Sequence, residues 1–190
     1  MIMKKLIVVD MQNDFLLPGG KLSISSPDVD TTKELRQGVG EFAKNFDGRV
    51  ICTADSHELD DPEFKQFPPH CIKDTEGAEL CDEVKNALGS LDKTVTKLTF
   101  NSDGIPVMVM PYYIYKAKEE VLTPFEIHIV GVCTHICVHD IASQIANTYK
   151  ERWGVLADIT IHRDLCGDFD PEMAEMCLKR LQNLYGVKVV

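Results

Sequence analysis

The feature of this chain that most limits its fold is an alternation of short apolar runs with longer segments of helical periodicity. The apolar runs are rich in β-branched residues and fall at residues 5–9, 49–53, 126–132 and 155–161, with shorter ones at 94–97 and 187–190. Helical spacing marks the segments at residues 29–46, 78–88, 106–120, 136–149 and 171–185. Strands and helices that alternate in this way form a parallel sheet with helices on both faces. We therefore predict an α/β fold, a doubly wound sheet of about six strands, in a single domain over residues 1–190.

Composition and charge argue against two classes of partner. The chain has 44% hydrophobic and 26% charged residues, a balance typical of globular proteins. Its formal net charge of −10 opposes binding to a phosphate backbone, and no block of Lys and Arg offers a basic stripe. The longest nearly apolar stretch, at residues 105–115, is interrupted by prolines and is shorter than the roughly 18 residues of a membrane span. We expect neither a nucleic-acid partner nor a membrane segment.

The cysteines and the N-terminal segment indicate the compartment. Seven cysteines are an odd number, which argues against a secreted disulfide framework and for reduced thiols. The apolar run at residues 6–9 is too short for the core of a signal peptide. We therefore expect a cytoplasmic protein. A chain of this length buries roughly 70% of its unfolded surface, so any metal site is expected to serve function rather than folding.

Reactive side chains follow successive predicted strands at the point where each strand ends. Asp10 closes the first, Asp55 and His57 follow the second, Lys97 closes the third, and Cys137 lies shortly after the fourth. In a doubly wound sheet, ligands bind outside the carboxyl ends of the strands, where the strand order reverses. The sequence therefore predicts an active site at this edge, with Asp10, Lys97 and Cys137 as base, cation and nucleophile.

Cys137 is the candidate nucleophile because it lies at the start of the predicted helix 136–149. Backbone N–H groups and the helix dipole at this position predict a stabilised thiolate and a lowered pKa. The alternative is a small buried core residue, a common role for cysteine. Asp10 likewise has two interpretations, as a turn cap or as a general base beside the thiol.

A metal site is predicted in the loop after the second strand, where Asp55, His57, Glu63 and His70 cluster. Imidazole and carboxylate ligands favour Zn²⁺, Mn²⁺ or Fe²⁺, and three or four protein ligands leave positions open for water or substrate. The alternative is a solvated acidic loop, since further carboxylates lie in the same segment.

A rival metal site would use Cys133, His135, Cys137 and His139, which occupy alternate positions. Such a pattern lines one face of a strand. The residues from Ile136 onward follow helical spacing, so alternate side chains would point about 200° apart rather than converge. We therefore favour the loop that carries two histidines.

Four segments of the chain together form a more specific pattern. They are Asp10, Gln12, Asn13, Asp14 and Phe15 with Pro18, Gly19 and Gly20; Asp55, Ser56 and His57 with Phe67, Pro68, Pro69 and His70; Lys97; and residues 131–138. This pattern resembles the isochorismatase-like cysteine hydrolases, and within them the nicotinamidase and pyrazinamidase branch. The resemblance extends over nearly the whole length of the chain.

The resemblance implies a role for each catalytic candidate. Cys137 rather than Cys133 is the nucleophile, with Asp10 and Lys97 as its catalytic partners. A cis peptide before Cys133 helps to aim the backbone N–H groups of Cys133 and Cys137 as an oxyanion hole.

The resemblance also implies how the substrate is held. Phe15, Phe67 and Phe100 surround an aromatic substrate, and Glu63 is a further metal ligand. A homo-oligomer is expected on the same ground.

Some residues depart from the family pattern and bear on the substrate. His135 replaces an Asp that is usual two residues before the cysteine, and Cys133 replaces a small or aliphatic residue. Ser56 stands in place of a common Trp, and Phe100 in place of a frequent Tyr.

The predicted reaction is hydrolysis of nicotinamide to nicotinate and ammonia through a thioester on Cys137. One divalent metal ion, zinc foremost, is expected to orient this small-molecule substrate by its pyridine nitrogen. Two alternatives stay open. One is a hydrolase of another small amide or ureido compound. The other is a catalytically silent metal-binding or redox-sensing protein.

Overall fold

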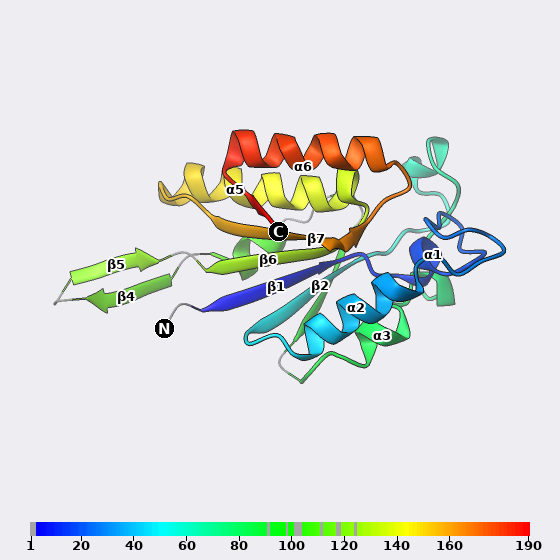
Figure 1. Ribbon diagram of the computed structural model, residues 1–190, viewed down its shortest axis with the longest axis horizontal. Coiled ribbons are helices and arrows are strands. Elements are labelled where there is room, and N and C mark those ends of the chain that lie inside the picture. Colours follow the sequence, from blue (N-terminus) through cyan, green and yellow to red (C-terminus); the bar gives the residue numbers. More distant parts are fainter. Residues whose placement is uncertain are drawn as a thin grey trace.

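The computed structural model describes residues 3–90, 92–97, 99–100, 104–110, 112–116, 119–123 and 125–190. Its centre is a parallel six-stranded sheet in the order β3-β2-β1-β6-β7-β8 (Figure 1). The strands are β1 Lys4–Val9, β2 Arg49–Asp55, β3 Lys93–Lys97, β6 Glu126–Val132, β7 Asp158–Gly167 and β8 Lys188–Val189. The predicted doubly wound α/β sheet is confirmed.

The central strands are largely apolar because helices cover both faces of the sheet. In β1, Ile7 and Val9 pack into the core beneath α5 (His139–Trp153) and α6 (Pro171–Tyr185), which lie together on one side (Figure 1). Leu6 and Val8 of the same strand point the other way, into the core formed with α2 (Lys33–Lys44) and α3 (Asp82–Lys85). Each such buried side chain stabilises the fold by about 1.5–3 kcal/mol, so the run admits little polarity.

The two long helices on the first face end where the sequence changes character. Asp170 caps α6 by accepting a hydrogen bond from the Met173 N–H, and Pro171 occupies the first helical position. Gly186 and Gly154, which follow α6 and α5, have φ angles of 69° and 65°. These left-handed conformations favour glycine and stop the helices. The predicted helix 171–185 is thereby confirmed, whereas α5 runs past residue 149 to Trp153.

The predicted helix over residues 106–120 is wrong. A short helix, α4 (Gly104–Met108), is followed by an antiparallel pair, β4 (Tyr112–Lys116) with β5 (Glu119–Thr123), which projects from the body (Figure 1). The aromatic and β-branched sequence of β4 favours a strand, and Pro111 cannot continue a helix.

Other predicted boundaries also shift. The only α-helix in the segment 78–88 is the one-turn helix α3, and α2 begins at Lys33 rather than at residue 29. The strand predicted at 155–161 is β7, which begins at Asp158 and extends to Gly167. The extension of β7 matters most, because it moves the residues that follow it to the carboxyl edge of the sheet.

The order of the strands places this edge of β1 and β6 at the centre of the molecule. The chain moves outward from β1 to β2 and β3, and then in the opposite direction from β6 to β7 and β8. The order therefore reverses between β1 and β6, the position where ligands bind in such sheets.

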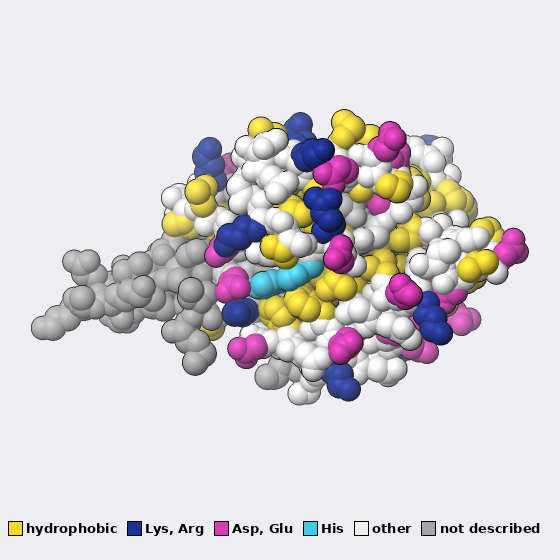
Figure 2. Space-filling view, in the orientation of Figure 1, with side chains coloured by type: hydrophobic (Ala, Val, Ile, Leu, Met, Phe, Trp, Pro, Cys, Tyr) yellow, Lys and Arg dark blue, Asp and Glu magenta, His cyan; other side chains and the backbone are white. Residues whose placement is uncertain are grey.

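On the face in Figure 2, Lys and Arg side chains are interspersed with Asp and Glu. Within the described part of the chain, no helix combines the length and apolarity that a bilayer crossing requires.

Candidate active site

The predicted catalytic residues meet at the carboxyl edge of the sheet. The Nζ atom of Lys97 lies 2.8 Å from Oδ2 of Asp10 and donates a hydrogen bond of 3.6 Å to Sγ of Cys137. Asp10 follows β1, Lys97 ends β3, and Cys137 lies in the turn after β6. All are buried, with exposed fractions of 0% for Asp10, 4% for Lys97 and 7% for Cys137. The topology thus brings these groups together and removes them from bulk water.

Lys97 is the cation of this cluster. Its Nζ atom also hydrogen-bonds Oδ1 of Asp55 and the carbonyl oxygen of Thr99. Burial by itself lowers the pKa of Lys97, but the attraction of the Asp10 and Asp55 carboxylates outweighs it and holds the pKa well above its usual range. Lys97 therefore stays protonated between two carboxylates.

Asp10 is held in a position suited to accept a proton. Burial raises the pKa of Asp10, against the opposing effect of Lys97, and the negative charge of Asp55 adds to the rise. The Thr53 hydroxyl donates a hydrogen bond of 2.7 Å to Oδ1 of Asp10, and the Asp10 backbone has a φ of 48°. A carboxylate with a raised pKa is a stronger base, which suits proton transfer from a thiol.

The predicted lowering of the Cys137 pKa is wrong. Burial and the negative charge of Asp10 raise the pKa of the Cys137 thiol well above its usual range, although Lys97 opposes them. These effects outweigh the helix N-terminus, because the loss of hydration disfavours a buried thiolate. Cys137 therefore rests as a thiol and depends on a neighbouring base.

The nucleophile segment has an unusual backbone. The expected cis peptide is present between Val132 and Cys133, and Thr134–Val138 form a π-helical turn that leads into α5. Before this turn, Gly131 has a φ of 118°, and a Cβ atom there would lie 2.1 Å from the carbonyl oxygen of Val9. Only glycine allows β6 to pass β1 this closely.

The rival metal site does not form. Ligand atoms converge in two groups among the described residues, and neither group includes Cys133, His135, Cys137 or His139. The helical turn is the physical reason, since it spreads alternate side chains around an axis.

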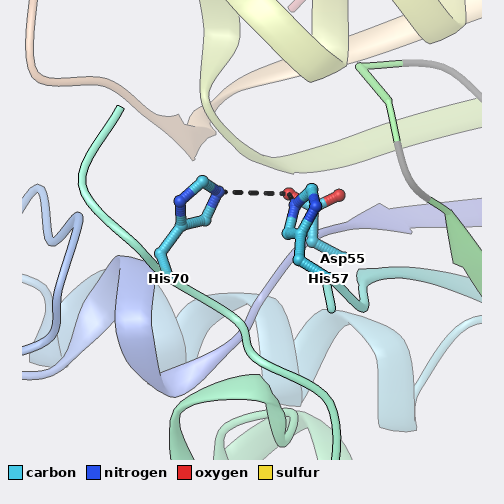
Figure 3. Close-up of side chains that lie close together, drawn as sticks. All are labelled: Asp55, His57 and His70. Atoms are coloured by element: carbon cyan, nitrogen blue, oxygen red, sulfur yellow. Dashed lines mark ion pairs between the residues drawn. The ribbon is translucent and has the colours of Figure 1, made fainter. Parts of the chain in front are cut away.

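The predicted metal loop brings Asp55, His57 and His70 together. Their ligand atoms lie within 4.8 Å of one another, and all three side chains are buried. The two Nε2 atoms lie 3.8 Å (His57) and 3.9 Å (His70) from Oδ2 of Asp55, and Figure 3 shows the His70 ring directed toward this carboxylate. These separations are too long for hydrogen bonds. The space between the three groups is polar and lined by atoms that bind metals.

Backbone hydrogen bonds hold the two halves of the metal loop side by side. The His57 N–H donates to the carbonyl oxygen of Cys71 at 3.0 Å, and the Lys73 N–H donates to that of His57 at 2.9 Å. The Cys71 N–H also donates to Oδ2 of Asp14 at 2.7 Å. His70 is thereby fixed opposite the end of β2, where Asp55 lies.

The outer nitrogens of the two histidines define which ring atoms face inward. The Nδ1 atom of His57 lies 3.0 Å from Oδ2 of Asp61, and that of His70 lies 2.9 Å from the carbonyl oxygen of Pro68. Both partners accept hydrogen bonds, so each Nδ1 carries a proton and each Nε2 is the ring atom left to bind a cation. The His57 Nε2 atom is buried and has no hydrogen-bond partner. The donor set therefore fits a bound cation.

Asp55 connects the catalytic cluster with the histidine cluster. Its Oδ1 atom accepts from Lys97 and its Oδ2 atom faces the histidines. Burial raises the pKa of Asp55, but the nearby His57 ring and the charge of Lys97 bring it below its usual value. Glu63 lies at the rim, with Oε1 3.9 Å from Nε2 of His70. Its carboxylate converges with His57 and Asp61 in a second group of potential ligand atoms.

A pocket beside these clusters is lined by the predicted phenylalanines. Phe15, Phe67 and Phe100 border it together with Asp10, His70 and Cys137. The ring of His70 lies 5.3 Å from that of Phe15 and 6.4 Å from that of Phe67, and Phe67 lies 6.1 Å from Phe100. A small ring held there contacts apolar side chains and both polar clusters.

Comparison with known proteins agrees with this geometry. The isochorismatase domain model matches residues 4–190. The chain belongs to the isochorismatase domain family. It is 28% identical to the uncharacterized isochorismatase family protein PncA of Bacillus subtilis, over 98% of both chains, and 28% identical to nicotinamidase 1 of Arabidopsis thaliana, over 87% of this chain and 69% of the relative.

Solved structures share the fold of this isochorismatase domain. The crystal structure of nicotinamidase PncA from Bacillus subtilis covers 98% of each chain at 27% identity, with a TM-score of 0.73. The pyrazinamidase of Pyrococcus horikoshii in complex with zinc covers 98% of each chain at 23% identity, with a TM-score of 0.72. The second similarity concerns the fold alone.

The sequence assigned no individual role to several residues of this site. Asp61 looked like one acidic residue among several, and Thr53 was one more residue of an apolar strand. The Gln12 side chain pins the end of β2 through bonds of 2.8 and 2.7 Å to the backbone of Asp55. Phe169 lines the pocket, but the predicted strand ended at residue 161, too early to bring it to this edge. A correct prediction of the end of β7 would have placed Phe169 at this edge.

Proposed function

We propose that this protein is a cysteine-dependent amidohydrolase that converts nicotinamide to nicotinate and ammonia. The observation that carries the proposal is that Asp10, Lys97 and Cys137 lie in contact with one another. The same aromatic pocket is lined by Asp10 and Cys137 and by members of the histidine cluster, Asp55 and His70. Relatives named nicotinamidase from Arabidopsis thaliana and Saccharomyces cerevisiae, at 28% and 27% identity, support it.

Asp10 and Cys137 carry out the first half of the reaction. Asp10 takes the thiol proton as Sγ of Cys137 attacks the carboxamide carbon, which forms the S–C bond. Collapse of the tetrahedral intermediate breaks the C–N bond, and Asp10 returns the proton to the departing ammonia. The raised pKa of the thiol makes this base necessary.

Water completes the turnover at the same two residues. Asp10 takes a proton from water as the water oxygen attacks the thioester carbon. The S–C bond then breaks, nicotinate leaves, and the sulfur of Cys137 regains a proton. The balance is one amide and one water consumed for one carboxylic acid and one ammonia.

Lys97 and the nucleophile turn stabilise the charges in these steps. The cationic Lys97 orients the Asp10 carboxylate and favours its ionised form. The backbone N–H groups of Cys133 and Cys137 form the proposed oxyanion hole, an interaction worth about 3 kcal/mol per donor.

Asp55, His57 and His70, with Glu63 as a further ligand, would hold one divalent ion. Zinc is the first choice for two imidazoles and carboxylates, and manganese or iron also suits them. When bound, the ion would supply an open coordination position for the pyridine nitrogen of the substrate. Phe15, Phe67 and Phe100 then confine the ring so that its carboxamide stays over the sulfur.

An ammonia-release assay over a panel of amides tests the proposal. The purified protein, supplied with Zn²⁺, Mn²⁺ or Fe²⁺, is expected to hydrolyse nicotinamide and pyrazinamide. Release from only aliphatic amides or ureido compounds would favour the other hydrolase. No release from any member, with metal bound, would favour a silent sensor.

Two further parts of the proposal concern the setting of the protein. The seven cysteines form no disulfide, which agrees with a reducing compartment such as the cytoplasm. A homo-oligomer, with a small-molecule amide as the substrate, remains a prediction from the family resemblance.

A further inference from the structure

The carboxylate of Asp168, just beyond β7, is saturated by N–H groups of nearby residues. Its Oδ2 atom lies 2.8 Å from the backbone N–H donor of His135, and both of its oxygens lie 2.8 Å from Nδ1 of the same residue. Its Oδ1 atom accepts from the Asp170 N–H at 2.9 Å. Because a carboxylate only accepts, the His135 ring donates from Nδ1. His135, which no step of the proposed reaction uses, thus binds the segment after β7.

Further bonds fasten the same segment on both sides of residue 169. The Thr134 hydroxyl donates to the carbonyl oxygen of Gly167 at 3.0 Å, so the nucleophile turn holds the segment twice. The Asp170 side chain accepts from the Met173 N–H and caps α6. Phe169 therefore lies between two anchored neighbours, which restricts the direction of its ring.

Phe169 forms a wall of the pocket that is separate from the other phenylalanines. Phe15 and Phe67 pack near His70, and Phe100 packs near Phe67. The Phe169 ring instead lies 5.1 Å from that of His135, edge to face at 83°. It lines the pocket together with Cys133, Ile136 and Cys137, yet half of its surface remains exposed. An apolar ring in this position gains burial when a flat ligand covers it.

We propose that Phe169 is a specificity-determining residue that contacts the substrate ring, and that His135 and Asp168 are the positioning residues that hold it. The selected substrate class is flat aromatic amides, over aliphatic or ureido ones. This inference rests on the proposed function, whose other parts do not involve these residues. The Phe169 side chain has no titratable or hydrogen-bonding group, so its contribution is to substrate binding.

The first test replaces the ring. Phe169→Ala is expected to raise the KM for nicotinamide about tenfold, with kcat within about twofold of wild type. The preference for nicotinamide over butyramide, as a ratio of kcat/KM, should fall by a similar factor. The control is Met176→Ala, an exposed apolar residue of α6 outside the pocket, which should leave both quantities unchanged. An unchanged KM and preference for Phe169→Ala, or a loss confined to kcat, would overturn the proposal.

The second test separates positioning from folding. Asp168→Ala is expected to raise KM as Phe169→Ala does, and the double variant should be no worse than either one, because Asp168 acts through the ring. Asp168→Asn keeps an acceptor oxygen and should recover part of the effect. Should Asp168→Ala fail to fold by circular dichroism, His135→Asn removes the ring contact and retains the backbone bond. Additive effects in the double variant, or a normal KM in the folded positioning variants, would overturn the role of the pair.

A binding measurement distinguishes this inference from the proposed function. If the wild type releases no ammonia from any amide, the proposed function fails, and calorimetric titration with nicotinate tests Phe169 directly. A dissociation constant about tenfold weaker in Phe169→Ala supports the inference. Equal dissociation constants overturn it, and no nicotinate binding to wild type overturns both.

Discussion

The catalytic cluster and the histidine cluster share the carboxylate of Asp55, yet they balance buried charge in opposite ways. In the catalytic cluster Lys97 lies between Asp10 and Asp55, so the chain itself supplies the cation. In the histidine cluster the ring nitrogens of His57 and His70 face Asp55 at distances beyond hydrogen bonding. The catalytic cluster therefore contains its own counter-charge, whereas the histidine cluster, as we propose, takes its cation from solution.

The pKa values of the two clusters express the same difference. Lys97 has its pKa raised by carboxylates that it contacts directly. The pKa of His57 is raised to about 9, chiefly by Asp55 and against the effect of burial. A negative potential that favours a proton on His57 also favours a divalent cation in its place.

The largest expected effect comes from removing the nucleophile of the complete cluster. Cys137→Ala should lower turnover on the order of a thousandfold or more, because nucleophile and base act as a unit. Cys133→Ala, the matched control, should be far milder, since its proposed part is a backbone N–H. Ammonia release measures both variants, and mass spectrometry locates the acyl adduct. An adduct on another cysteine, or equal losses, would reject the assignment.

The internal balance of the catalytic cluster predicts a large loss of stability when its cation is removed. Lys97→Met leaves Asp10 and Asp55 buried without their partner, and should lower the free energy of unfolding by about 3 kcal/mol. Lys93→Met on the same strand changes an exposed residue and should be nearly neutral. Urea unfolding gives both values. Equal stabilities would mean that the cluster is not balanced by Lys97.

The histidine cluster should lose its ion without losing its fold. The protein is expected to hold about one divalent metal per chain, and the double variant His57→Ala/His70→Ala should hold none. His139→Ala, outside the cluster, is the control. Elemental analysis measures the metal, and circular dichroism should show the secondary structure retained. Loss of the helical and strand signal on metal removal would show that the site is structural, and would contradict the expectation that the fold does not depend on the ion.

The orienting role of the ion predicts a preference among substrates of one shape. Benzamide presents the same ring and carboxamide as nicotinamide without the ring nitrogen, so its kcat/KM should be lower by about tenfold or more. Pyrazinamide retains a nitrogen and should resemble nicotinamide. Comparable values for benzamide and nicotinamide would remove this role and favour an amide without a pyridine ring.

The smallest expected effect concerns the outer partner of His57. Asp61→Asn removes the negative acceptor that fixes the ring, and should weaken metal affinity by about tenfold with the fold unchanged. Asp60→Asn alters an exposed neighbour and serves as the control. Competition with a chelator measures the affinity. Identical affinities in the two variants would show that Asp61 does not orient His57.

The sequence alone was sufficient to predict the sheet and the edge that carries the site. Apolar runs that end at Asp10, at Asp55 and at Lys97 are local signals, because a buried strand admits few polar residues before its end. The loop proposed to bind a metal was also predictable from the sequence, because His57 and His70 lie in one short segment with carboxylates. Sequence signals were weakest over residues 106–120, where prolines and aromatic residues override an apparent helical spacing.

Properties that depend on distant neighbours were decided only by the tertiary structure. The raised pKa of Cys137 follows from burial and from the charge of Asp10, a residue far away in the chain, and these outweigh the local helix. Asp61 and Phe169 acquire their positions from hydrogen bonds and from the length of β7. Residue type and periodicity are local, whereas hydration and electrostatic potential at a side chain sum over all groups that the fold brings near it.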